Sequence, residues 1–91
     1  MREMNWAVAD ISAALGDLLV DQSASSSGLV RFIQTDSRQV GKGDLFVCLI
    51  GDRFDAHEFA QQVVEAGACA LVTDRLLDID ISQLVVKDTR L

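Results

Sequence analysis

Residues 51–59 (Gly-Asp-Arg-Phe-Asp-Ala-His-Glu-Phe) form the densest group of side chains suited to anion binding in this chain. They follow an apolar run, and Asp55 with Glu58 three residues later has the spacing of a helix N-cap and capping box. A loop that enters a helix presents unpaired backbone N–H groups and the positive end of the helix dipole. Arg53 adds a charge and Phe54 an aromatic ring. The segment predicts an anion site, although an ordinary capped strand-to-helix connection has the same features.

A second pattern occurs twice, at the ends of two predicted strands. Residues 35–38 (Thr-Asp-Ser-Arg) and 87–90 (Lys-Asp-Thr-Arg) both contain an aspartate, a hydroxyl residue and an arginine in that order. Asp, Ser and Thr at a strand end form local side-chain turns, which explain the aspartates without a ligand. The arginines are less well explained in this way, because a guanidinium fork commonly binds carboxylate or phosphate.

No residue has the sequence setting of a catalytic group. Gly41-Lys42 is not a phosphate loop, because Asp36 stands where its first glycine should be and Gly43 follows the lysine. Signatures of nucleophilic catalysis are missing, and one histidine with two cysteines offers too few ligands for a metal site. His57, in a predicted first helical turn, is interpreted as a hydrogen-bonding surface residue. We therefore predict a binding domain without catalytic or metal-ligating residues.

The apolar pattern predicts the elements that position these segments. One helix is expected over residues 6–15, capped by Asn5 and ended by Gly16, and another from the Asp55 cap to a stop at Gly67. Strands are expected at 18–20, 29–35, 45–50, 68–73 and 81–86, with loops at 21–28 and 39–44. This order predicts an α/β fold with a small, mixed, mostly buried sheet and flanking helices. Strands 45–50 and 68–73 should run parallel, joined by a right-handed helical crossover.

Length and composition indicate one globular domain over residues 1–91, with 49% hydrophobic and 24% charged residues. The net charge of -6 argues against nucleic acid or an anionic membrane surface as a partner. No apolar stretch approaches the roughly 20 residues of a membrane span, and no signal peptide is recognisable. Cys48 and Cys69 lie in apolar runs and are interpreted as buried, reduced thiols, which favours a cytoplasmic location.

Four ordered segments resemble the N-terminal domain of the Mur ligases. They are residues 35–38, 43–47 (Gly-Asp-Leu-Phe-Val), 51–59 and 66–68 (Ala-Gly-Ala), and the similarity runs from about residue 5 to residue 91. Within that family, residues 53–57 and the ending 86–90 resemble the branch that adds D-alanyl-D-alanine to UDP-N-acetylmuramoyl-tripeptide in peptidoglycan synthesis.

The resemblance implies that this chain holds the UDP end of the UDP-N-acetylmuramoyl-peptide. A central domain of the same protein would bind ATP and Mg²⁺ and form the amide bond, so this segment alone would need no cofactor and would be inactive. By position in the family's motifs, the residues lining the uridine and diphosphate region are Ser37, Arg38, Arg53, Phe54, Asp55, Ala56 and His57. Asp88, Thr89 and Arg90 match the segment at the exit toward the central domain. Ile50 stands where a lysine is expected, which removes one phosphate partner.

The residues themselves also allow a function of another class. A free-standing regulatory or protein-interaction module can use the same α/β scaffold, because a fold does not determine a function. The two hypotheses differ in the reading frame that they expect beyond Leu91. A ligase predicts that this frame continues into a phosphate loop, whereas a free-standing module does not.

Overall fold

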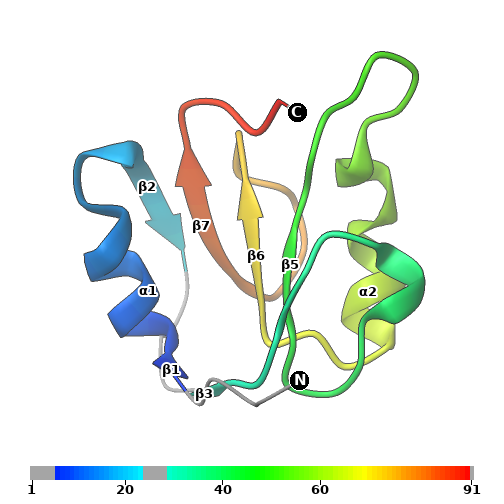
Figure 1. Cartoon of the computed structure of the whole chain (residues 1–91), viewed down its shortest axis with the longest axis horizontal. Helices are drawn as coiled ribbons and strands as arrows, with labels where there is room; N and C mark the ends of the chain where they lie inside the picture. The colour runs from blue at the N-terminus through cyan, green and yellow to red at the C-terminus, as the bar shows by residue number, and fades with distance from the viewer. Residues whose placement is uncertain (1–5, 24–28, 91) are drawn as a thin grey trace.

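The computed structural model describes residues 6–23 and 29–90 (Figure 1). The predicted α/β class is confirmed, since a five-stranded sheet packs against two α-helices. None of the helices in the described residues has the length and apolar character needed to cross a membrane. The elements are β1 (Trp6–Ala7), α1 (Val8–Leu15), η1 (Gly16–Leu18), β2 (Leu19–Ser23), β3 (Leu29–Val30), β4 (Ile33–Gln34), η2 (Ser37–Gln39), β5 (Leu45–Val47), η3 (Ala56–Phe59), α2 (Ala60–Glu65), β6 (Ala70–Thr73) and β7 (Ser82–Val86), where η marks a 3₁₀ turn.

The main sheet has the strand order β2-β7-β6-β5-β4. Strands β4, β5, β6 and β7 are mutually parallel, with Leu45 opposite Ala70 and Ala70 opposite Ser82, and β2 runs antiparallel to β7 at one edge. The predicted mixed sheet and the parallel pairing of β5 with β6 are therefore confirmed. Because four neighbouring strands point the same way, the connections after them leave from the same edge of the sheet.

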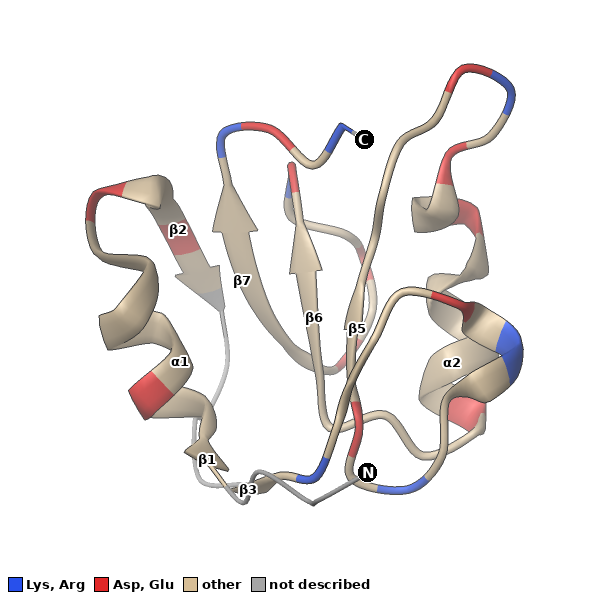
Figure 2. Ribbon diagram, viewed as in Figure 1, with Lys and Arg blue, Asp and Glu red and all other residues tan. Residues whose placement is uncertain are grey.

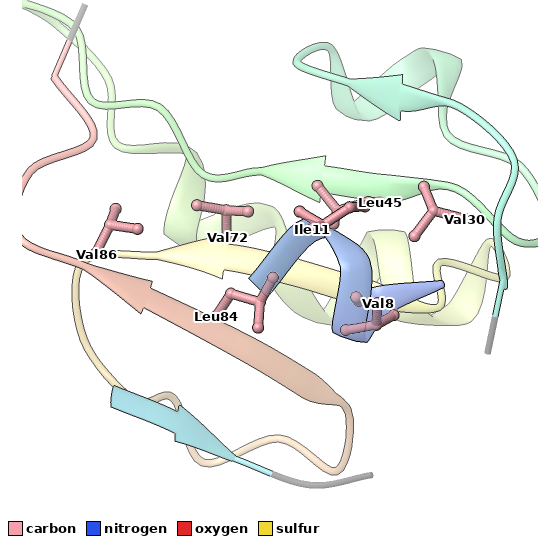
Figure 3. Packing of buried hydrophobic residues seen from close by; sticks show 8 residues of the cluster. Val8, Ile11, Val30, Leu45, Val72, Leu84 and Val86 are labelled. Atoms are coloured by element: carbon pink, nitrogen blue, oxygen red, sulfur yellow. The ribbon is translucent and has the colours of Figure 1, made fainter. Parts of the chain in front are cut away.

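Both faces of the sheet are buried, as the continuous apolar runs predict. Alternate residues of a strand point to opposite faces, so β5 and β6 each contribute to two separate clusters. The face under α1 holds Val8, Ile11, Val30, Leu45, Ala70, Val72, Leu84 and Val86 (Figure 3). The face under η3 and α2 holds Phe46, Cys48, Ala56, Ala60, Val63 and Leu71.

Both predicted helices form, but each begins later than expected. Residues 6–7 pair with β3, so α1 starts at Val8 and its N-cap is Ala7. The expected cap Asn5 lies outside the described residues. The second helix does not start at Asp55, because residues 56–59 form the 3₁₀ turn η3 before α2. The expected glycine stops are confirmed, with φ of 51° at Gly16 and 108° at Gly67.

The predicted strand limits differ most from the structure in three places. Residues 29–35 are divided into β3 and β4, because β3 pairs with β1 whereas β4 joins the main sheet. The run 45–50 is a regular strand only to Val47, and Ile50 then makes isolated bridges to Asp55 and Arg90. Residues 21–23 belong to β2 instead of a loop, because they continue its pairing with β7.

The two thiols differ in burial, which corrects the expectation that both are fully buried in strands. Cys48 lies just beyond β5 and is 0% exposed. Its burial raises the pKa of the thiol to about 12, and the negative charges of Asp55 and Asp74 add to this effect whereas Arg75 opposes it. Cys69 precedes β6, is only partly buried and is also free.

We expect a water-soluble thiol reagent to label Cys69 in the native protein and Cys48 only after unfolding, as measured by peptide mass spectrometry with Cys48→Ala and Cys69→Ala variants as references. Equal labelling of both thiols in the native state would contradict this core arrangement.

Candidate functional site

Four connections follow the C-terminal ends of the parallel strands. They comprise residues 36–38 after β4, 51–55 after β5, 74–75 after β6 and 87–90 after β7. In open α/β sheets this edge is the usual place for a ligand, because loops from several strands meet there. All the site residues predicted from sequence lie in these connections or in η3, which comes after the second of them.

The positive charges of the molecule are distributed unevenly (Figure 2). No strand and neither α-helix carries a Lys or Arg among the described residues, so these side chains lie in connections and turns. Five of the seven described cations follow the parallel strands: Arg38, Arg53, Arg75, Lys87 and Arg90. Asp36, Asp52, Asp55, Asp74 and Asp88 accompany them, so these connections together are neutral although the whole chain has a net charge of -6. An anion meets less repulsion here than over the rest of the molecule.

The loop 51–55 is a tight, exposed projection from the end of β5 (Figure 1). The Gly51 N–H donates to the Phe54 carbonyl at 2.9 Å, which closes the turn. The Phe54 ring lies against Gly51 so closely that a Cβ built there would be 2.3 Å from Cε1. Together with Arg90 these residues line a hollow of about 450 Å³ that also includes Ile50 and Asp52. The sequence thus places an aromatic ring and a guanidinium at one opening.

The arginines of the two similar segments, residues 35–38 and 87–90, pair with the aspartates of their own segments to different extents. Arg38 donates through Nε and Nη2 to both oxygens of Asp36, at 3.0 and 2.9 Å, and Arg90 lies 3.9 Å from Asp88. Both aspartates also accept the backbone N–H two residues later, which confirms the predicted side-chain turns. Arg53, by contrast, has no hydrogen-bond or ion-pair partner among the described residues. It is therefore the guanidinium most available to a ligand.

The structure does not join all the predicted site residues into one contact network. Ser37 and Arg38 make no hydrogen bond or ion pair with residues 51–57 in the described part of the chain. Arg90, in contrast, lies beside the loop, because Ile50 forms an isolated β-bridge with Arg90. The Ile50 N–H donates to the Thr89 carbonyl at 3.1 Å.

Asp55 and His57 are engaged with each other, and the His57 side chain is shielded from solvent. Asp55 Oδ1 accepts the His57 backbone N–H at 2.9 Å and also meets ring Nδ1, so Asp55 caps η3 through His57 and the predicted capping box with Glu58 is not formed. His57 is 6% exposed, which corrects its interpretation as a surface residue. Partial burial, the largest influence, raises the pKa of Asp55, but hydrogen bonds from the His57 backbone, Arg75 and the His57 ring outweigh it and lower the pKa to about 2.

Asp74 and Arg75 complete this group, and no sequence motif pointed to them. The Asp74 N–H donates to His57 Nε2 at 3.0 Å, and Arg75 donates to Asp55 Oδ2 at 2.9 Å and to Asp74 Oδ1. Their only sequence signal was position, since they come directly after a predicted buried strand. The placement of residues 74–75 beside residues 55–57 depends on the register of β6 against β5, for which the sequence gave no local signal.

Thr89 and its neighbours border a second hollow, of about 440 Å³. Its wall is mainly apolar, and its polar rim is formed by residues 87–90. Thr89 is 5% exposed and its hydroxyl has no hydrogen-bond partner among the described residues. The apolar lining residues are Leu15, Leu18, Val47, Leu49, Val72 and Val86.

The arrangement at this edge suits binding better than catalysis. It offers an unpaired guanidinium and an aromatic ring, which together can hold an anion attached to a planar group, whereas the N–H groups of Ala56 and His57 are already bonded to Leu49 and Asp55. Both ring nitrogens of His57 are already bonded, so that histidine is not free to act as a base. Within the described residues, no group of three or more His, Cys, Asp or Glu could hold a metal ion.

Similarity to known proteins agrees with this geometry. A profile described as "Mur ligase family, catalytic domain" matches residues 29–89, which include every candidate residue except Arg90. The UDP-N-acetylmuramoyl-tripeptide–D-alanyl-D-alanine ligase of Escherichia coli K12 is 48% identical over 77 residues, which are 85% of this chain and 17% of that protein. A UDP-N-acetylmuramoyl-L-alanyl-D-glutamate–2,6-diaminopimelate ligase of Bacillus velezensis is 47% identical over 60% of this chain and 11% of its own length.

Solved structures show the same relationship. The crystal structure of MurF from Acinetobacter baumannii superposes on 98% of this chain and 19% of its own, with a TM-score of 0.84 and 34% identity. The chain thus spans less than a fifth of the length of these relatives. A profile match over more than half of the sequence and a shared fold at this level of identity establish the relationship. The chain belongs to the Mur ligase family.

Proposed function

We propose that this chain is the N-terminal, substrate-binding domain of a ligase that adds D-alanyl-D-alanine to UDP-N-acetylmuramoyl-tripeptide in the cytoplasm. The observation that carries the proposal is the 48% identity to the E. coli ligase of that name over 85% of the chain. The geometry supports the UDP end of the substrate as the part held here. Arg53 suits a phosphate, and Phe54, which can stack on the uracil, lines a hollow together with Arg90.

We infer that ATP and Mg²⁺ do not bind to the described residues of this chain. The Gly41-Lys42 turn is the segment nearest to a phosphate loop in composition, but the Gly41 N–H donates to Asp44 Oδ2 at 2.9 Å. Asp44 is 1% exposed, so a buried carboxylate fills the turn where a phosphate would need to lie. On this proposal ATP and Mg²⁺ bind to another domain of the same protein, which is also the partner of this one.

A titration of the ¹⁵N-labelled chain with UDP tests the proposed site directly. We expect amide shifts at Arg53, Phe54 and Arg90 and smaller ones at Ser37 and Arg38, with binding in the millimolar range because one domain offers only one side of the site. ADP is the control, since it has the same diphosphate and a different base. Shifts concentrated at the opposite edge of the sheet, around Lys42, or no shifts at millimolar UDP would contradict the proposal.

A further inference from the structure

The loop 51–55 has few contacts of its own that would fix its direction. Residues 52–54 are exposed, and the Gly51–Phe54 hydrogen bond closes the turn without attaching its tip to the rest of the protein. The strand side is attached through the Ile50 contact with Thr89. The other side of the loop is joined to the strand side by the Ile50–Asp55 bridge and by the Ala56 N–H, which donates to the Leu49 carbonyl at 2.9 Å, and the Asp55 side chain attaches it to the loop after β6.

Asp55 is held by an anchor from a distant part of the sequence. Its Oδ1 accepts from the His57 backbone and ring, and its Oδ2 accepts from Arg75 Nη2 at 2.9 Å. His57 Nε2 lies 3.0 Å from the Asp74 backbone nitrogen, whose N–H donates to it, and 3.1 Å from Asp74 Oδ1, while Nδ1 faces Asp55. Arg75 closes the ring of contacts by also donating to Asp74. The loop after β5 is thus tied to the loop after β6.

Two of these side chains, His57 and Asp55, already have partners at their polar atoms, although the Asp55 side chain is 40% exposed. The His57 side chain is 3% exposed with both nitrogens bonded, and both oxygens of Asp55 have partners. Asp55 would also repel a phosphate bound at the neighbouring Arg53. Arg75, whose side chain is half exposed, places a positive charge on that carboxylate and reduces the repulsion.

We propose that Asp55, His57 and Arg75 are positioning residues that hold the loop 51–55 in its binding conformation and do not themselves contact the nucleotide. The inference rests on the proposed function, and it assigns a role to Arg75, which no sequence motif indicated. It also changes the expected role of Asp55 and His57, which family position placed in contact with the substrate. The ligand in question is a nucleoside diphosphate.

Two variants of Arg75 separate attachment of the loop from charge alone. Arg75→Ala removes both contacts, whereas Arg75→Lys keeps the charge but loses the planar fork that bridges two carboxylates. We expect Arg75→Ala to speed amide exchange at Gly51 and Ala56 roughly tenfold relative to the β6 amides, and to weaken UDP binding several-fold. Arg75→Lys should recover part of the affinity and less of the exchange protection. Lys42→Ala, an exposed cation at the opposite edge, should change neither.

The outcomes distinguish this inference from the proposed function. Unchanged exchange at Gly51 and Ala56 in Arg75→Ala would overturn the anchor, and so would faster exchange with unaltered UDP affinity. Exchange that rises equally in β6 would indicate a general loss of stability and would also overturn it. If the unmodified chain does not bind UDP, the proposed function fails, and the exchange measurement alone then decides whether Arg75 holds the loop.

Discussion

Replacing Gly67 by alanine is expected to lower the free energy of unfolding by about 2–4 kcal/mol, because two independent penalties meet at this residue. Gly67 ends the second helical segment with a φ of 108°, which side-chain-bearing residues rarely adopt. A Cβ built there would also lie 2.8 Å from Lys42 Cα, which is backbone and cannot rotate away. The substitution should therefore push the helix end away from the turn before β5, whose Gly43 N–H donates to the Gly67 carbonyl at 2.9 Å.

Gly16 provides the matched control for this prediction. It also ends a helix with a positive φ, of 51°, but a Cβ built there has no heavy atom within 4 Å. Gly16→Ala should therefore cost only the backbone strain, about 1–2 kcal/mol. Urea unfolding followed by circular dichroism would measure both variants. Equal losses would show that the close approach of Gly67 to Lys42 contributes nothing to stability.

The core of this fold is readable from sequence because its strands are apolar on both faces. The runs that became β5, β6 and β7 have no polar alternation, so a doubly covered sheet was the consistent prediction. Both glycine stops were readable for a similar reason, since a glycine directly after a helical pattern has a specific backbone use. These features are local in the sequence, and the apolar runs among them predict a sheet covered on both faces.

Apart from the parallel arrangement of β5 and β6, pairing across the sheet was not readable in the same way. Residues 29–35 look like one strand, but their two ends pair with different partners and the strand divides at Arg31 and Phe32. The same limit applies to the site. Asp55 and His57 were predicted from a helix-start pattern, but nothing local shows that Asp74 and Arg75 lie beside them, because that contact depends on the register of β5 and β6.

The family motifs treat Arg38 and Arg53 alike, whereas the structure makes Arg53 more available to a phosphate than Arg38. The motifs assign Arg38 and Arg53 the same kind of contact. In the structure, Arg38 is already bonded to both oxygens of Asp36, which raises the pKa of Arg38 and lowers that of Asp36. A phosphate at Arg38 would have to share or displace that carboxylate. Arg53 has no such competitor among the described residues.

Arg53→Ala in the full ligase that the proposed function implies should raise the KM for the UDP-linked peptide roughly ten- to hundredfold. The reason is the loss of a charge-assisted hydrogen bond to a phosphate, worth about 1.5–3 kcal/mol. The KM for ATP should barely change, because ATP does not fit the residues of this domain. Steady-state kinetics with each substrate varied in turn would measure both constants.

Arg38→Ala is expected to raise the same KM less than tenfold, because the pairing with Asp36 offsets much of what a phosphate contact would contribute.

Lys42→Ala removes the same unit of charge at the opposite edge of the sheet, and it should leave the KM for the UDP-linked peptide unchanged. This control separates a local contact from the general effect of making an acidic chain more negative. If Lys42→Ala weakened binding as much as Arg53→Ala, the interaction would be long-range electrostatics instead of a contact in the loop 51–55. If Arg38→Ala had the larger effect, the diphosphate would lie beside η2 and the hollow at Phe54 and Arg90 would not be its site.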